Sequence, residues 1–113
     1  MRVTYKNKKM EKLAKDPREL RRVFGENERS IRKCLDTLRA VPNLAELFEP
    51  PFRRFRCHLL HNDKKGTYSL DVKDPYRLLF TPKEPVPIKS AGGIDVTKVE
   101  AVCVLELAID THR

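Results

Sequence analysis

The feature that most constrains the fold is a change in apolar spacing at Pro50-Pro51. Before this pair, apolar side chains recur every three or four residues, which is typical of amphipathic helices. After it, Tyr68, Leu70 and Val72 alternate with polar residues, which is typical of half-buried strands. A helical part followed by antiparallel strands predicts an α+β fold.

The chain has 113 residues, a usual length for one domain with its own core. We therefore predict a single domain over 1–113, mainly helical over 1–49 and mainly β over 50–113. Its expected architecture is an N-terminal helical hairpin packed on a small, mainly antiparallel sheet.

The helical part has clear boundary signals after a short possible strand at 2–5. Asp16 can cap a helix that begins at Pro17, and Glu19 has the spacing of a capping box. Gly25 ends this helix, whose apolar face we expect to hold Leu20, Val23 and Phe24. The next helix has an apolar stripe and stops at Pro42; the stripe is Ile31, Cys34, Leu35 and Leu38. One further helical turn is expected over 43–48.

In the second part we predict a strand over 54–60 and a hairpin that turns at Lys73-Asp74-Pro75. Residues 82–97 are rich in proline and glycine and predict a long exposed loop. Residues 99–109 are apolar on both faces, as in a central strand.

The net charge of +8 is concentrated in the first 40 residues, which hold 13 basic and 6 acidic side chains. A basic surface of this kind favours an anionic partner such as nucleic acid, although a solvated helix face or an acidic protein partner would also explain it. No apolar run is long enough to cross a bilayer, no signal peptide is evident, and the three cysteines are widely spaced. We therefore expect a cytoplasmic protein with reduced thiols.

Candidate chemical groups lie in the strand part: His58, His61, Arg77, Asp110 and His112. Histidine can move protons near neutral pH, and arginine can stabilise the charge of a phosphoryl transition state. Each residue also has a structural explanation; Arg77 in particular would pair with Asp71 across the hairpin.

A metal site is not expected from these residues. Cys57 and His61 could ligate zinc, but there is no pair of cysteines at C-x-x-C spacing, and the carboxylates are scattered. We expect neither a metal nor any other cofactor.

Three stretches resemble HigB toxins of the RelE superfamily, which belong to bacterial toxin–antitoxin systems. Residues 57–70 resemble the family's "His-Pro-Leu-Lys-Gly-Asp-x-Lys-Gly-x-x-Ser" stretch, residues 74–80 its "x-x-x-Arg-Leu-x-Phe" strand, and residues 106–112 its "Asp-Tyr-His" tail. The matches occur in the family's order and cover most of 54–112. The helical hairpin also fits.

The resemblance implies a RelE-like fold and a ribosome-dependent endoribonuclease that cuts mRNA in the A site without a metal. It implies that the 2′-hydroxyl of the RNA attacks the neighbouring phosphate, that His58 and His61 lie near this phosphate, and that Arg77 stabilises its charge. Asp110 and His112 would supply acid–base or orienting groups. The implied partners are a helix-turn-helix antitoxin similar to HigA, the ribosome and mRNA. The expected RNA contacts are Arg18, Arg21, Arg22, Arg29, Arg32, Lys33, Arg54, Arg56, Lys64 and Lys65.

Two positions depart from the family pattern: its lysine is His61 here, and its tyrosine is Thr111. We hypothesise that Lys64 or Lys65 supplies the missing cation, since a histidine is only partly charged at neutral pH. The alternative function is that of a RelE-fold protein that is not a nuclease, either a gyrase poison similar to ParE or a degenerate nucleic-acid-binding protein.

Overall fold

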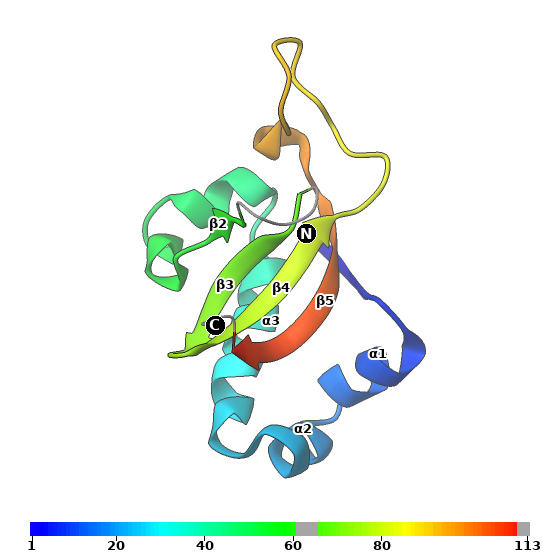
Figure 1. Cartoon of the computed structure of the whole chain (residues 1–113), viewed down its shortest axis with the longest axis vertical. Coiled ribbons are helices and arrows are strands. Elements are labelled where there is room, and N and C mark those ends of the chain that lie inside the picture. Colours follow the sequence, from blue (N-terminus) through cyan, green and yellow to red (C-terminus); the bar gives the residue numbers. More distant parts are fainter. Residues whose placement is uncertain (61–65, 111–113) are drawn as a thin grey trace.

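The computed structural model describes residues 1–60 and 66–110, and within them the chain has an α+β fold (Figure 1). The first part contains β1 (Arg2–Tyr5) and three helices: α1 (Lys8–Ala14), α2 (Pro17–Phe24) and α3 (Glu28–Ala40). Short 3₁₀ turns follow at Leu44–Phe48 and Phe52–Phe55. The second part contains β2 (His58–Leu59), β3 (Tyr68–Lys73), β4 (Tyr76–Pro82) and β5 (Ala101–Asp110). None of the helices in these residues is long and apolar enough to span a membrane.

The described strands form one sheet in the order β1-β5-β4-β3-β2. Only the β1–β5 pair is parallel; the other three pairs are antiparallel. The sheet is therefore mainly antiparallel, as the sequence predicted. β5 is an interior strand, because it lies between β1 and β4. Its prediction as a central strand is confirmed.

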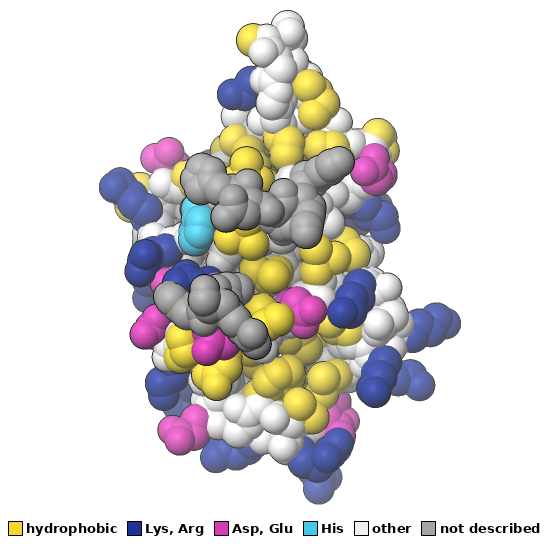
Figure 2. All heavy atoms as spheres, in the orientation of Figure 1, with side chains coloured by type: hydrophobic (Ala, Val, Ile, Leu, Met, Phe, Trp, Pro, Cys, Tyr) yellow, Lys and Arg dark blue, Asp and Glu magenta, His cyan; other side chains and the backbone are white. Residues whose placement is uncertain are grey.

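One face of the sheet is covered by α3, which crosses behind it, whereas α1 and α2 lie beyond its lower end (Figure 1). The predicted stripe of α3 is buried, and it packs with apolar side chains of β3, β4 and β5 in a single core. No helix of the described residues lies on the opposite face of the sheet. We call it the open face. Figure 2 shows apolar side chains along the middle of this face, with Lys and Arg side chains along its sides.

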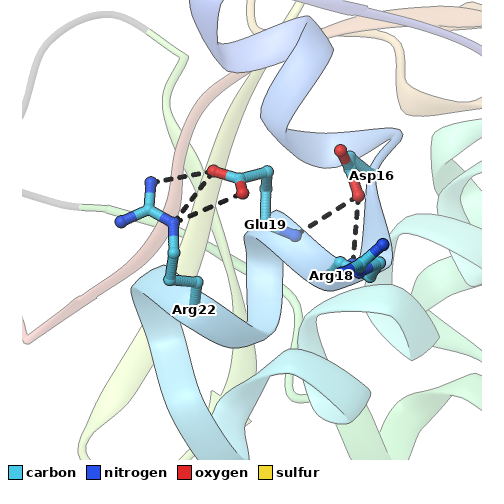
Figure 3. Close-up of polar contacts among 4 residues, drawn as sticks. All are labelled: Asp16, Arg18, Glu19 and Arg22. Carbon is cyan, nitrogen blue, oxygen red and sulfur yellow. Dashed lines mark hydrogen bonds and ion pairs between the residues drawn. The ribbon is translucent and has the colours of Figure 1, made fainter.

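At the start of α2, one of the two interactions of the predicted capping box is present, the one made by the Asp16 side chain (Figure 3). The Asp16 carboxylate accepts hydrogen bonds from the backbone N–H groups of Arg18 (3.1 Å) and Glu19 (3.3 Å). The Glu19 carboxylate does not bond back to the Asp16 N–H, because it accepts from the guanidinium of Arg22 instead, at 2.8 Å. The Asp16 N–H donates to the Leu13 carbonyl. The prediction of a complete capping box is therefore wrong in the second interaction, the hydrogen bond from the Asp16 N–H to Glu19.

Two other details of the helical part differ from expectation. Val23, expected on the buried face of α2, is 49% exposed, while Leu20 is fully buried. The helix over 8–14 was not predicted as a separate element. Gly25 ends α2 as expected, with a φ of +58° that favours glycine.

The predicted strand over 54–60 is mostly wrong. Phe52–Phe55 forms a 3₁₀ turn, and Arg56 has a left-handed φ of 51°, so strand pairing begins only at His58. The buried residues Phe55 and Cys57 are two positions apart, as in a strand, and this spacing caused the error. The turn at Arg56 changes the direction of the chain between them.

The predicted hairpin of β3 and β4 is confirmed, and so is the exposed segment before β5. That segment projects from one end of the sheet (Figure 1) and contains a bridge between Ile88 and Ile94. One expectation for β3 fails: Ser69, placed on the solvent side by the alternation, is fully buried. β3 is an interior strand, so His58 and Leu79 lie directly on either side of Ser69.

Candidate functional site

The pairing register brings four polar residues to the open face. His58 of β2 is opposite Ser69 of β3, and Asp71 of β3 is opposite Arg77 of β4. Residues directly opposite in a sheet point to the same side, and so do residues two apart along a strand. His58, Ser69, Asp71 and Arg77 therefore share one face. Tyr68, Leu70 and Leu78, at the alternate positions, are buried in the core on the other face.

Asp71 lies between two arginines. Arg77 Nη1 donates a hydrogen bond to Asp71 Oδ1, and Arg56 Nη1 lies 3.7 Å from Asp71 Oδ2. The Arg77 side chain is only 12% exposed, whereas that of Arg56 is 69% exposed. The structural explanation of Arg77, a pair with Asp71, is thus confirmed. Two cations share one carboxylate here, so the group keeps a net positive charge that an anion can neutralise.

The His58 ring has a defined tautomer in its neutral form. Its Nδ1 lies 2.9 Å from the carbonyl oxygen of Arg56. A carbonyl oxygen only accepts, so Nδ1 must carry the proton and Nε2 holds the lone pair. His58 is exposed. Its Nε2 is consequently available to take a proton from a bound molecule.

Ser69 is a residue of this face that the sequence reasoning did not select. Its hydroxyl is fully buried and has no hydrogen-bond partner in the part of the chain that the structure describes. Buried polar groups without partners are uncommon in proteins, and each calls for an explanation. One signal in the sequence could have indicated Ser69: it matches the serine that ends the HigB pattern in the stretch at 57–70.

Several predicted site residues are not brought to this cluster by the described structure. In the pairing of β4 with β5, Ile109 is opposite Arg77 and Asp110 is opposite Tyr76. Because side chains alternate along a strand, Ile109, and not Asp110, lies on the same face as Arg77. His61, Lys64, Lys65 and His112 lie outside the described residues. Arg54 is exposed and stacks on the Phe55 ring, with 5.1 Å from its guanidinium carbon to the ring centroid.

The predicted RNA-contacting residues of the helices are exposed, and those of α3 lie on the side of the molecule opposite the open face. Arg29, Arg32 and Lys33 are outside the buried stripe of α3 and point away from the sheet, because that stripe packs on the face opposite the open one. Arg22 pairs with Glu19. Arg21 and Arg32 both pair with Glu28, at 3.7 and 2.7 Å. No ion pair within the described residues involves Arg29 or Lys33.

Two of the cysteines, Cys34 and Cys57, are not suited to nucleophilic chemistry at neutral pH. Burial raises the pKa of the Cys34 thiol to about 12, with a smaller contribution from the Asp71 charge, and burial alone raises that of Cys57 to about 12. Within residues 1–60 and 66–110, no three His, Cys, Asp or Glu side chains gather as potential metal ligands.

The chain was compared with known proteins. No family model, curated protein or solved structure matches it.

Proposed function

We propose that this protein is a metal-independent endoribonuclease with a RelE-like fold, acting as the toxin of a toxin–antitoxin pair. The observation that carries the proposal is the exposed His58, whose Nε2 has no hydrogen-bond partner among the described residues and shares the open face with the guanidinium groups of Arg56 and Arg77. A base and two cations on one face are what the cleavage of a phosphodiester by its own 2′-hydroxyl requires.

The proposed step begins when a phosphate of the RNA contacts Arg77 and Arg56. His58 Nε2 takes the proton of the neighbouring 2′-hydroxyl, whose oxygen attacks the phosphorus. The bond from phosphorus to the 5′ oxygen breaks, and this oxygen needs a proton from an acid. The products are a 2′,3′-cyclic phosphate and a 5′-hydroxyl end. His61 and His112, which the resemblance implicates, are candidates for the acid.

The contact between Arg77 and Asp71 is compatible with this role. A guanidinium has five N–H donors in a fixed plane, and the carboxylate of Asp71 accepts from Nη1 alone. The remaining donors can serve a phosphate. Because the side chain is held by Asp71 and is mostly buried, little conformational entropy is lost when the phosphate binds.

The basic surface of α3 supports the proposed target, mRNA on the ribosome. Arg29 and Lys33 on this surface have no ion pair among the described residues and are exposed, so they can contact ribosomal RNA phosphates. They lie on the side of the molecule opposite His58. The protein could therefore hold the ribosome on one side and mRNA on the other. A helix-turn-helix antitoxin is the proposed inhibitor.

The test is primer extension on transcripts after brief induction of the wild type, His58→Gln and Arg56→Ala. Both residues are exposed, so these variants should fold. We expect codon-phased cuts from the wild type, with about 10²–10⁴-fold slower cleavage by His58→Gln. Lys89→Ala, an exposed site on the projecting segment, is the control and should cut normally.

Full cleavage by His58→Gln would end this mechanism. DNA damage without mRNA cuts would favour the alternative of a gyrase poison. One observation favours a non-catalytic nucleic-acid-binding protein: Arg77 already pairs with Asp71, so the net positive charge of the cluster is carried by the exposed Arg56. That function predicts RNA binding by the purified wild type with no cleavage on translating ribosomes.

A further inference from the structure

β5 has an edge that no described strand covers. β1 pairs with β5 only as far as Val104, and the last bond between them joins the Lys6 N–H to the Val104 carbonyl. The chain then leaves the sheet and enters α1 (Figure 1). β5 continues to Asp110, with β4 on its other side. Over Glu106–Ile109, the side that faces α1 is thus an open strand edge, which can pair with another extended chain.

An apolar hollow lies beside this edge. It has a volume of about 250 Å³ and is lined by Met10 and Leu13 of α1, Phe24 of α2, and Leu107 and Ala108 of β5. A second hollow of about 370 Å³ shares Lys9 and Leu13 with the first and extends to Val23, which is 49% exposed. The two hollows adjoin at Lys9 and Leu13 of α1, and together we call them the groove. Figure 2 shows apolar side chains in this region, bordered by Lys and Arg.

The rim of the groove has an excess of positive charge. Lys6 pairs with Glu106 at 3.7 Å, and Arg22 pairs with Glu19. The Asp16 carboxylate is already bonded to two backbone N–H groups at the start of α2. Lys9 and Lys12 also line the groove, and no ion pair within the described residues involves either of them. The uncompensated charge is therefore positive, which complements an acidic ligand.

We propose that this groove binds an acidic segment of a partner protein, which adds as a short strand to the edge of β5 at Glu106–Ile109. Successive side chains of a strand point to opposite sides. Those on one side would enter the hollow at Leu13 and Phe24 and must be apolar. Those that stay at the rim of the groove, within reach of the long side chains of Lys9 and Lys12, are expected to be Asp or Glu. Main-chain bonds supply affinity and the hollow supplies selectivity. The proposal does not depend on the nuclease activity.

The test uses a labelled ten-residue peptide in which Glu alternates with Val or Ile, titrated with the full chain by fluorescence anisotropy. One control peptide has Lys in place of each Glu. Another has methyl groups on alternate backbone nitrogens, which removes the donors of one strand edge. We expect the acidic peptide to bind at least tenfold more tightly than either control. In ¹⁵N NMR spectra, amide signals of Glu106–Ile109 should shift and gain protection from exchange.

Variants of the protein locate the site. Val23→Asp and the double variant Lys9→Glu/Lys12→Glu change exposed side chains and should each weaken binding at least tenfold. Ile88→Asp and Lys83→Glu/Lys89→Glu make the same changes on exposed residues of the projecting segment and should have no effect.

Equal binding of the acidic and basic peptides, or no binding of the acidic one, would overturn the proposal. So would protection that appears elsewhere than β5. If the purified chain forms a dimer that Val23→Asp dissociates, the groove is occupied by a second copy instead. If an RNA oligonucleotide or anionic vesicles displace the peptide from the wild type, the groove serves those ligands and the proposal fails.

Discussion

Arg77 and Asp71 face each other across the β3–β4 hairpin, and the guanidinium donates a hydrogen bond to the carboxylate. Both side chains are largely buried, with 12% and 28% exposed. Removal of one partner would leave the other charge poorly solvated, whereas removal of both would not. The pair thus couples the stability of the hairpin to the geometry of the candidate site.

We predict that Asp71→Ala lowers the free energy of unfolding by about 2 kcal/mol, because Arg77 is left without its main partner. Arg77→Met alone should cost a similar amount, and the double variant should cost clearly less than the sum. Urea denaturation of the four proteins measures this cycle. Additive losses would mean that the two side chains do not interact in solution.

The two parts of the predicted capping box should differ in their effect on stability. Asp16→Ala removes an acceptor from two backbone N–H groups and should lower the free energy of unfolding by about 1 kcal/mol. Glu19→Ala removes only an exposed pair with Arg22, so its effect should be close to the measurement error. Thermal or urea denaturation compares the two. A larger loss for Glu19→Ala would show that the capping box is reciprocal after all.

The Glu28 carboxyl should make the free energy of unfolding depend on pH. The hydrogen bond from Arg32, more than any other cause, holds the pKa of this carboxyl below its usual 4.5. A carboxyl group whose pKa is lower in the folded state than in the unfolded state stabilises the protein fully at pH values above its unfolded-state pKa. This stabilisation is lost as the pH falls through the folded-state pKa. Glu28→Gln should therefore destabilise the protein at pH 7 but hardly at pH 3. Denaturation at both values measures the difference.

Glu26→Gln is the matched control for this experiment, because Glu26 is exposed. It should show no such change between pH 7 and pH 3. A Glu28→Gln penalty that is equally large at pH 3 would mean that shape or neutral hydrogen bonding, and not charge, accounts for the role of Glu28.

The thiols should differ in reactivity. Cys34 and Cys57 are buried and have pKa values of about 12, so very little thiolate is present and reagents cannot reach it. Cys103 is partly exposed on β5. At pH 8, iodoacetamide should modify Cys103 first in the native protein and all three cysteines in the denatured one. Peptide mass spectrometry reads the sites. Rapid native labelling of Cys34 would show that α3 separates readily from the sheet.

The local signals in the sequence were sufficient for most of the elements. The stripe of α3, the end of α2 at Gly25 and the turn after Lys73 each depend on residues a few positions apart, and all three agree with the structure. The strand over 54–60 failed for the same reason. Phe55 and Cys57 have the spacing of a strand, and nothing nearby in the sequence indicates the left-handed backbone of Arg56 between them.

The candidate site was predictable in its residue types but not in its arrangement. The sequence singled out His58 and Arg77 and raised Asp71 as a partner for Arg77. That His58, Ser69, Asp71 and Arg77 share one face follows from the pairing of three strands, which the sequence does not specify. The burial of Ser69 has the same origin, since its neighbours come from β2 and β4.

The sequence by itself thus determined the helical and β parts, the boundaries of α2 and the basic character of the first 40 residues, because periodicity, capping and charge are local properties. Only the tertiary structure decided which side of the sheet α3 covers, and so which residues remain on the open face. It also decided that β1 stops at Tyr5 while β5 runs on to Asp110. Both outcomes depend on contacts between segments that are far apart in the chain. Strand register and the order of the layers determine which residues become neighbours there, and local sequence patterns do not specify them.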